Sequence, residues 1–380
     1  MITPAYVYDL DLLKARIRAV REALPGIPLA FSVKANSFIT AAAAGEVSHV
    51  EVCSPGELRI CETLGVAPEQ IIYSGVVKGA EDLREAIRYG AGLLTAESPS
   101  QFRLLCAAAA AEGKRPKVLL RLSSDNQFGM DPEDLLAIAR SRESCPEACL
   151  WGVHYYSGTQ KKKPEQIAAD LERLSAVLER CEKECGWKPE LVEYGPGLAV
   201  EYFKENGEEA DLDLLARVAP LLREFALRYP LGIEMGRFMA APCGSYYTSV
   251  KDLKTSYGIR YAMLDGGIHH LKYYGQIMAM HVPPIVQHPV REGEEKEYCL
   301  CGSLCTVADV LAKSARLREL ETGDVLEFRR CGAYSLTEAS SLFLSRNLPA
   351  VYLREGGKDA LVRGAARASD LNTVGYGLNE

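Results

Sequence analysis

The stretch LAFSVKANS, residues 29–37, places a lysine at the end of an apolar run. The run is predicted to form a strand buried on both faces, and Lys34 follows at its carboxyl end. A lysine is rarely buried unless its amine is paired or used. Most lysines at strand ends reach solvent. The sharper interpretation is that this amine works inside a site, as a Schiff-base former.

Several later apolar segments also end in residues that can bind or react. Glycines there leave backbone N–H groups free to approach a phosphate, an arginine adds a charged fork, and a glutamate can hold a protonated pyridine nitrogen. With a lysine that forms a Schiff base, these are the groups that pyridoxal phosphate (PLP) requires. Singly, each has a simpler interpretation as a turn glycine or a structural ion pair. The residues are Arg121, Tyr156, Ser157, Gly158, Gly195, Gly197, Glu234, Gly236 and Arg237.

The elements that must position these residues alternate regularly over the first 245 residues. Eight near-continuous apolar segments, separated mostly by amphipathic helical patterns, predict parallel strands buried on both faces. Eight such units favour an α/β fold of the (β/α)8 TIM-barrel type, with reactive groups at the carboxyl ends of the strands. An open doubly wound sheet is the alternative, although no GxGxxG loop follows the first strand. The segments are 27–33, 50–54, 70–75, 92–97, 117–124, 150–156, 190–195 and 231–236.

The character of the chain changes after about residue 245. Segments such as SYYTSVKDLKTSYGIRYAMLDGG and GDVLEFRRCGAYSL carry β-branched and aromatic residues with short turns. They predict a mostly β C-terminal domain, to which the first ten residues add a strand. The expected domains are therefore the barrel at 11–245 and the β domain at 1–10 plus 246–380.

Composition excludes several classes of partner. The net charge of −7 argues against nucleic acid, and no apolar span is long enough for a membrane helix. The start MITPAYVYDLD lacks the basic and apolar regions of a signal peptide, which favours a cytoplasmic protein. The 12 cysteines include no CxxC pair, so reduced thiols and no metal site are expected.

Seven segments together identify a family resemblance: AFSVKAN, VCSPGEL, GVHYYSGTQ, EYGPGLAVEY, IEMGRFMAAPCG, CGSLCTVADVL and CGAYSL. The chain resembles the alanine-racemase-fold (fold type III) PLP decarboxylases, the group that includes diaminopimelate and ornithine decarboxylases. The resemblance extends over nearly the whole chain, in family order. It implies a barrel followed by a C-terminal β domain. It also implies a homodimer whose active sites are each completed by the partner's C-terminal domain.

The resemblance also implies roles for individual residues. Lys34 would carry PLP as a Schiff base, and Glu234 would face the pyridine nitrogen. Ser157, the GPG backbone at Gly195 and Gly197, Gly236, Arg237 and Tyr334 would surround the phosphate. Cys305, from the partner subunit, would protonate the substrate carbon after CO2 leaves, since a thiol can act as the nearby acid. The simpler interpretation of Cys305 is a buried structural thiol.

The chain departs from the family pattern at positions that bear on the substrate. Tyr156 stands where the family usually stacks a histidine on the ring. Thr306 replaces the acidic residue that grips a distal amine, and Tyr273 replaces an arginine of the diaminopimelate enzymes. Charges buried without partners cost free energy, so a diaminopimelate-like end should fit poorly. His269 and His270 are candidates to line the distal pocket, with a turn or core role as the alternative.

The predicted function is PLP-dependent removal of the α-carboxylate of an amino acid. Local likeness points to a biosynthetic branch with a decarboxylase of carrier-protein-bound glutamate. This suggests an acylated, amidated or carrier-bound substrate, or a siderophore precursor. The alternatives are an amino acid racemase on the same fold, diaminopimelate decarboxylase proper and a non-catalytic PLP carrier. A non-catalytic PLP carrier lacks a second domain, whereas roughly 130 residues follow the eighth strand of this chain, enough for a further domain.

Overall fold

The computed structural model describes residues 2–375, and the chain divides into two compact units. Residue 1 and residues 376–380, part of the expected β domain, lie outside the described residues. Three stretches within the predicted barrel range, 11–13, 200–209 and 240–245, fall in the β unit. The barrel unit comprises Lys14–Ala199 and Ala210–Met239, and the β unit comprises Met1–Leu13, Val200–Glu209 and Ala240–Glu380.

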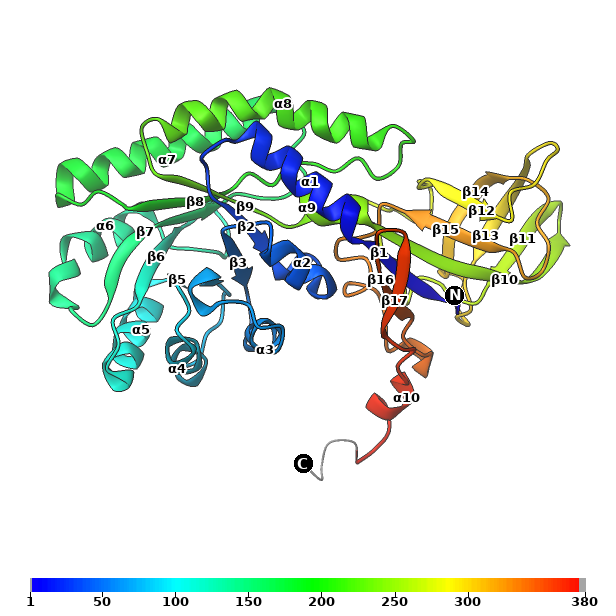
Figure 1. The fold of residues 1–380 in the computed structure, drawn as a ribbon, viewed down its shortest axis with the longest axis horizontal. Coiled ribbons are helices and arrows are strands. Elements are labelled where there is room, and N and C mark those ends of the chain that lie inside the picture. Colours follow the sequence, from blue (N-terminus) through cyan, green and yellow to red (C-terminus); the bar gives the residue numbers. More distant parts are fainter. Residues whose placement is uncertain (1, 376–380) are drawn as a thin grey trace. The chain divides into compact units, whose positions relative to one another are not determined.

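The strands of the barrel unit pair in sequence order, each parallel to the next, and β2 pairs with β9 to close the barrel (Figure 1). The expected α/β fold of the TIM-barrel type is confirmed, and every strand overlaps the segment predicted for it. The strands are β2 (Leu29–Ser32), β3 (His49–Val52), β4 (Ile71–Tyr73), β5 (Leu93–Ala96), β6 (Lys117–Leu122), β7 (Cys149–Tyr156), β8 (Leu191–Gly195) and β9 (Leu231–Met235).

Helices precede, connect and follow these strands, as parallel pairing requires. Local sequence sets their ends. In α5, Ser98 Oγ accepts a hydrogen bond from the Gln101 N–H at 3.1 Å, Pro99 opens the helix, and Gly113 ends it with a φ of +60°. No helix within residues 2–375 is long and apolar enough to cross a membrane. The helices are α1 (Leu10–Ala23), α2 (Thr40–Ala44), α3 (Pro55–Thr63), α4 (Ala80–Tyr89), α5 (Pro99–Glu112), α6 (Pro132–Arg140), α7 (Pro164–Cys185), α8 (Gly207–Ala226) and α9 (Arg237–Ala240).

The interior of the barrel changes character along the strands. A buried apolar cluster of Ala30, Ile72, Leu93 and Leu119 lies towards the amino ends. Further along, a buried polar side chain comes from every strand or from the position just past it, and eight of these, one for each strand, are here called the polar layer. Layers of inward-facing side chains are typical of TIM barrels. The polar layer consists of Ser32, Glu51, Ser74, Thr95, Arg121, His154, Glu193 and Glu234.

The β unit contains one sheet of nine strands within the described residues, with β14-β13-β11-β10-β1-β16-β17 in order and β15 joining β10 to β12. β1 pairs antiparallel with β10 and parallel with β16, so the N-terminal residues do add a strand to this sheet. A short helix, α10 (Ala368–Leu371), follows the last strand. The strands are β1 (Ala5–Asp9), β10 (Gly244–Ser256), β11 (Ile259–Leu264), β12 (Ile285–His288), β13 (Lys296–Cys301), β14 (Val310–Leu317), β15 (Val325–Arg329), β16 (Ala350–Glu355) and β17 (Lys358–Arg363).

One expectation about the cysteines is wrong. Cys106, on α5, forms a disulfide with Cys145, which follows α6, so not every thiol is reduced. The pair is separated by 39 residues in sequence, and the fold brings its Cα atoms to 6.5 Å. Spacing along the chain carried no signal for this pair, because packing between neighbouring helical segments creates the contact.

Candidate active site

Lys34 lies in the single turn that follows β2, where its amine meets carboxylates of the polar layer. Its Nζ donates hydrogen bonds to both carboxylate oxygens of Glu51, at 2.7 and 3.0 Å. Glu234 Oε1 lies 3.4 Å from the same Nζ, and Cys53 Sγ lies 3.5 Å away. The Lys34 side chain stays 40% exposed. The structure therefore holds this amine among acids at the mouth of the barrel, while part of the side chain remains accessible.

Glu234, on β9, is buried but held by three neighbours. Ser32 Oγ donates to its Oε1 at 2.9 Å, and His154 Nε2 lies 3.1 Å from its Oε2. Burial alone raises the pKa of Glu234, but the Lys34 ammonium and the His154 contact outweigh burial and hold it well below its usual range. Glu234 is therefore an anion, as a partner for a protonated pyridine nitrogen must be.

Two further groups near this centre keep their protons. Burial raises the pKa of Glu193 well above its usual range, and the negative charges of Glu234 and Glu51 raise it further. Burial and Glu51 raise the pKa of the Cys53 thiol in the same way. Within the described residues, neither carboxyl oxygen of Glu193 has a hydrogen-bond partner. The barrel thus holds a neutral acid beside an ionised one.

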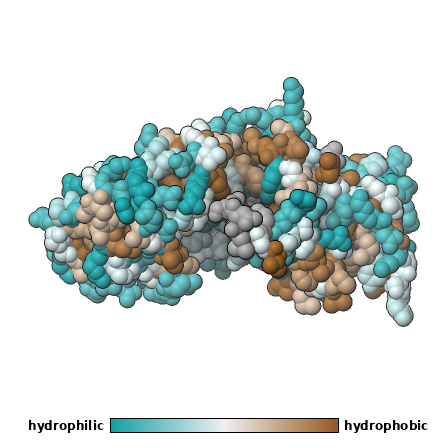
Figure 2. All heavy atoms as spheres, turned by 90° about the horizontal axis from the view of Figure 1, so that it is seen from below, coloured by the Kyte–Doolittle hydropathy of each residue, from teal (hydrophilic) through white to brown (hydrophobic). Residues whose placement is uncertain are grey.

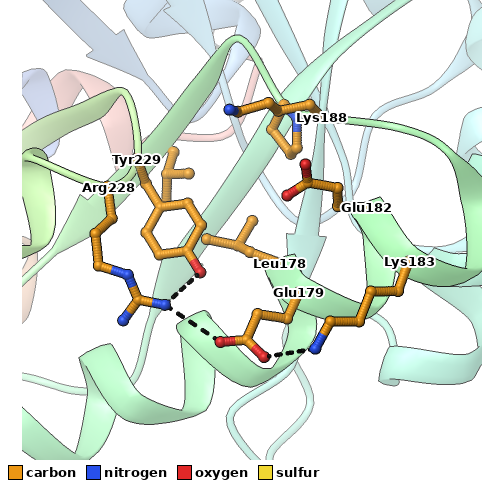
Figure 3. A pocket seen from close by; sticks show the side chains of 9 residues that line it. Leu178, Glu179, Glu182, Lys183, Lys188, Arg228 and Tyr229 are labelled. Carbon is orange, nitrogen blue, oxygen red and sulfur yellow. Dashed lines mark hydrogen bonds and ion pairs between the residues drawn. The ribbon is translucent and has the colours of Figure 1, made fainter.

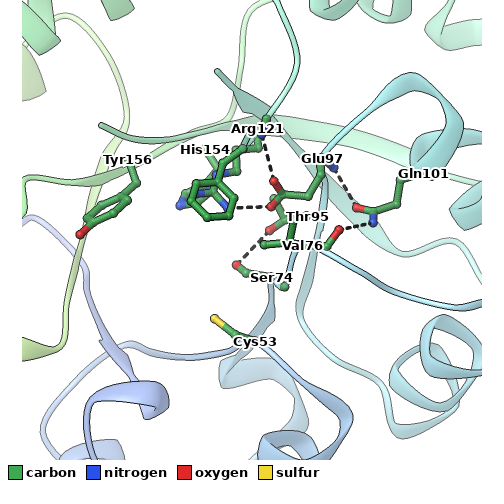
Figure 4. Close-up of polar contacts among 12 residues, drawn as sticks. Cys53, Ser74, Val76, Thr95, Glu97, Gln101, Arg121, His154 and Tyr156 are labelled. Carbon is green, nitrogen blue, oxygen red and sulfur yellow. Dashed lines mark hydrogen bonds and ion pairs between the residues drawn. The ribbon is translucent and has the colours of Figure 1, made fainter. Parts of the chain in front are cut away.

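Arg121, on β6, is fixed by a carboxylate on the neighbouring strand end (Figure 4). Its Nη1 donates to Glu97 Oε1 at 2.7 Å, and its guanidinium lies over the Phe128 ring. Glu97 Oε2 also accepts the Gly129 N–H at 3.0 Å. This pair orients Arg121 and ties down the loop after β6. Figure 4 also shows Tyr156, at the end of the adjoining strand β7, to one side of this pair.

Glycines shape the ends of β7, β8 and β9. A Cβ on Gly197, where φ is +58°, would lie 1.9 Å from the Gly158 carbonyl oxygen, so the two loops touch through backbone alone. A Cβ on Gly236 would lie 2.9 Å from the Ala35 side chain, next to Lys34. A Cβ on Gly195 would lie 2.6 Å from the Tyr156 ring. These close approaches leave room only for glycine at the three positions, here called the glycine cradle, which fits a phosphate bound by backbone N–H groups.

PLP therefore fits the residues present in the barrel unit. Lys34 would hold its aldehyde carbon, Glu234 its ring nitrogen and the glycine cradle its phosphate, with Arg237 beginning α9 beside Gly236. The Ser157 hydroxyl donates to Asp170 on α7, at 2.8 Å to either carboxylate oxygen, and is thus turned towards that helix.

The β unit places the remaining predicted residues. Cys305 is exposed on the loop after β13, with Thr306 beside it, and Tyr334 has a φ of +63°. Tyr273 is only 5% exposed. His269 and His270 are fully buried, and burial lowers their pKa to about 3 and about 4, so both are neutral core residues.

Sequence reasoning named Lys34 and Glu234 but missed some of the groups around them. Glu51, Glu97, Glu193 and Cys53 were not singled out. The available signal was period-two spacing, since Glu51 and Cys53 share one face of β3 and its continuation. Near-continuous apolar strands hide that signal, because neither face of the strand is marked as the inner one.

A cleft elsewhere on the barrel unit carries no comparable chemistry. Its volume is about 440 Å3, and it is lined by the end of α7 and the approaches to β8 and β9, at the amino ends of the strands (Figure 3). Three of its charged residues pair with one another: Glu179 Oε2 binds Lys183 at 3.2 Å, and Glu179 Oε1 binds Arg228 at 3.2 Å. In residues 2–375, no cluster of histidine, cysteine and carboxylate groups could hold a metal ion.

Comparison with known proteins places this barrel in a family. The family model described as pyridoxal-dependent decarboxylase, pyridoxal binding domain, matches residues 10–241. The L-glutamyl-[BtrI acyl-carrier protein] decarboxylase of Niallia circulans is 30% identical, over 97% of this chain and 92% of the relative. The diaminopimelate decarboxylase of Zymomonas mobilis is 28% identical, over 97% and 91%.

Among solved structures, the diaminopimelate decarboxylase of M. jannaschii in co-complex with L-lysine has the same fold. It superposes with a TM-score of 0.85 at 23% identity, over 97% of this chain and 91% of that one. The family match covers well over half of the chain and includes every residue described around Lys34. This protein therefore belongs to the pyridoxal-dependent decarboxylases, and it is a PLP-dependent amino acid decarboxylase.

Proposed function

We propose that the substrate is an amino acid whose distal end is acylated, amidated or bound to a carrier protein. The observation that carries this proposal is the lack of charge at two positions. The Tyr273 hydroxyl donates to the backbone oxygen of Arg329 at 2.6 Å, so this side chain offers no cation. Thr306 is half-buried, and its hydroxyl accepts from the Ala308 N–H at 3.3 Å. A free distal carboxylate or ammonium would meet no opposite charge at either position.

A cleft within the β unit has a matching character. Its volume is about 260 Å3, and its lining includes Ile268, Leu271, Tyr273, Val310 and Leu311. Two charged residues at the cleft, Lys272 and Glu338, pair with each other at 3.3 Å. The cleft thus presents apolar surface and a neutralised ion pair, which suits an uncharged distal chain.

The barrel residues divide the chemistry of decarboxylation among them. PLP, when bound, supplies the electron sink that accepts the electrons left behind by departing CO2. In this proposal Lys34 would hold the cofactor covalently, and Glu51 accepts hydrogen bonds from the lysine ammonium when it is free. The ionised Glu234 would hold the protonated ring nitrogen. Tyr156 would hold the ring by stacking, in place of the usual histidine, and Arg121 would help to hold it. An exposed thiol, Cys305, then delivers the proton to the α-carbon from the partner subunit.

A homodimer is part of the same proposal. The β unit exposes large apolar side chains in the segments 277–280 and 342–344 and at Val307. Val307 lies two residues after Cys305 in the sequence. Figure 2 shows hydrophobic patches among the hydrophilic residues that cover most of one face of the molecule. Apolar surface of this kind is commonly covered by a protein partner. A second copy of the chain would cover this surface and bring Cys305 to the barrel of its neighbour. The proposed dimer is a cytoplasmic enzyme.

The test is CO2 release by the PLP-loaded protein from a matched set of substrates. We expect turnover of a γ-glutamyl pantetheine thioester and of glutamate γ-amides, and little or none of diaminopimelate. Lys34→Ala should abolish both turnover and the visible absorption of lysine-bound PLP. Efficient turnover of diaminopimelate would overturn the substrate proposal and leave the decarboxylase intact.

Diaminopimelate decarboxylase proper is the second candidate, because an enzyme of that name is 28% identical over nearly the whole chain. Racemisation is distinguished in the same experiment by running it in D2O. Substrate recovered with deuterium at an inverted α-carbon, without CO2, would identify a racemase.

A further inference from the structure

Three buried side chains and the half-buried Ser157 meet behind the glycine cradle. Asp170, on α7, is 8% exposed, and its Oδ2 accepts a hydrogen bond from the Tyr194 hydroxyl at 2.6 Å. Ser157 Oγ donates to the same carboxylate, and Lys161 Nζ contacts both Asp170 Oδ2 and Ser157 Oγ. Lys161 is 7% exposed. These four residues are called the Asp170 cluster.

The backbone of Lys161 joins this cluster to the loop after β8. Its N–H donates to the Gly197 oxygen at 2.9 Å, and its own carbonyl accepts the Ala199 N–H at 3.0 Å. Ser157 immediately precedes Gly158, whose carbonyl leaves no room for a Cβ on Gly197. The segment 157–161 is therefore tied to α7 through side chains and to the β8 loop through backbone.

A buried ion pair seldom adds net stability, because desolvation of both charges offsets their attraction. Its best-attested use is to specify one geometry out of several. Here the chain has a geometry to specify, since Gly158 and Gly197 have no side chains of their own to hold the contact between their two loops. The order of donors is also defined: Ser157 accepts from Lys161 and donates to Asp170, so hydrogen bonds in series polarise one another.

We propose that Lys161 is a positioning residue for the phosphate group of PLP. Through Asp170 and Ser157 it holds the Gly158–Gly197 contact against α7, and so it sets the affinity of the chain for the phosphate. The inference rests on the cofactor and is independent of the substrate proposed above.

The test compares two ligands that differ only in the phosphate. PLP-free protein is titrated with PLP and, separately, with pyridoxal, following the visible absorption of the lysine-bound ring. In Lys161→Met we expect about tenfold to a hundredfold weaker binding of PLP, the range for one lost charged hydrogen bond, and an unchanged pyridoxal affinity. Lys162→Met, which removes an exposed charge next to Lys161, should change neither affinity.

A double variant separates positioning from the mere neutralisation of Asp170. Lys161→Met leaves the Asp170 carboxylate buried without its cation and should lower the melting temperature of the PLP-free protein. Lys161→Met/Asp170→Asn removes both charges and should recover much of that temperature while PLP affinity stays weak. Restored PLP affinity in the double variant would overturn the proposal. So would an equal loss of PLP and pyridoxal affinity in Lys161→Met. If Lys161→Met does not fold, the PLP and pyridoxal affinities of the double variant decide the question.

Discussion

Replacing Glu193 with glutamine should make this protein more stable at neutral pH. The Glu193 side chain is 2% exposed, and neither of its carboxyl oxygens has a hydrogen-bond partner within the described residues. Burial and the nearby carboxylates Glu234 and Glu51 raise its pKa well above the ordinary value of 4.5. Folding at neutral pH therefore forces a proton onto a group that is ionised in the unfolded chain.

The sign and size of the effect follow from proton linkage. Between 4.5 and the raised pKa the folded state binds more protons than the unfolded state, so stability falls as the pH rises. The loss approaches about 1.4 kcal/mol per pH unit. Two and a half units separate 4.5 from neutral pH, which sets an upper limit of about 3.4 kcal/mol at pH 7. Glutamine resembles the neutral acid in shape. It removes this penalty because its side chain is uncharged in both the folded and the unfolded chain, so folding requires no proton uptake.

The assay is thermal unfolding of the wild type and Glu193→Gln between about pH 5 and pH 8, where 1 kcal/mol corresponds to about 2–4 °C for a unit of this size. We expect the two proteins to converge near pH 5 and Glu193→Gln to melt progressively higher above it. Glu190→Gln, an exposed neighbour before β8, is the matched control and should show no trend. A variant that is less stable at every pH, by a constant amount, would refute the reasoning and show an ionised, paired Glu193.

Three further outcomes are expected. Glu97→Gln should lower the free energy of unfolding by about 3 kcal/mol, measured by urea denaturation, because it leaves the buried Arg121 guanidinium without its counter-charge. Thr306→Glu should raise CO2 release from ornithine or lysine at least several-fold relative to acylated substrates, because it supplies an anion for a distal ammonium. Burial lowers the pKa of His269 to about 3, so below about pH 6.5 the unfolded chain takes up a proton that the folded chain does not. Stability is therefore lost as the pH falls, and His269→Leu should reduce that loss in urea midpoints measured between about pH 4 and pH 7.

The sequence predicted the barrel well because its evidence was local and repeated. Each apolar segment gave a strand, and the rule that reactive groups lie at carboxyl ends of strands brought Lys34 and Glu234 together, 3.4 Å apart in the structure. The orientation of single side chains was beyond this reasoning. The Ser157 hydroxyl lies against α7, and the Tyr273 hydroxyl binds a backbone carbonyl. Both outcomes depend on packing between elements far apart in sequence.

The polar layer shows why the charges of this site had to be read from the structure. The carboxyl groups of Glu51, Glu193 and Glu234 project into one low-dielectric interior. Their mutual repulsion there prevents all three from being ionised at once. Lys34 and His154 hold Glu234 in its charged form, whereas burial, reinforced by the charges of Glu234 and Glu51, raises the pKa of Glu193 and keeps its proton on. Once PLP occupies the Lys34 amine, we expect the protonated ring nitrogen to take over as the cation facing Glu234. The side chains of the site thus keep Glu234 anionic, as a protonated ring nitrogen would require, and the energetic cost falls on Glu193.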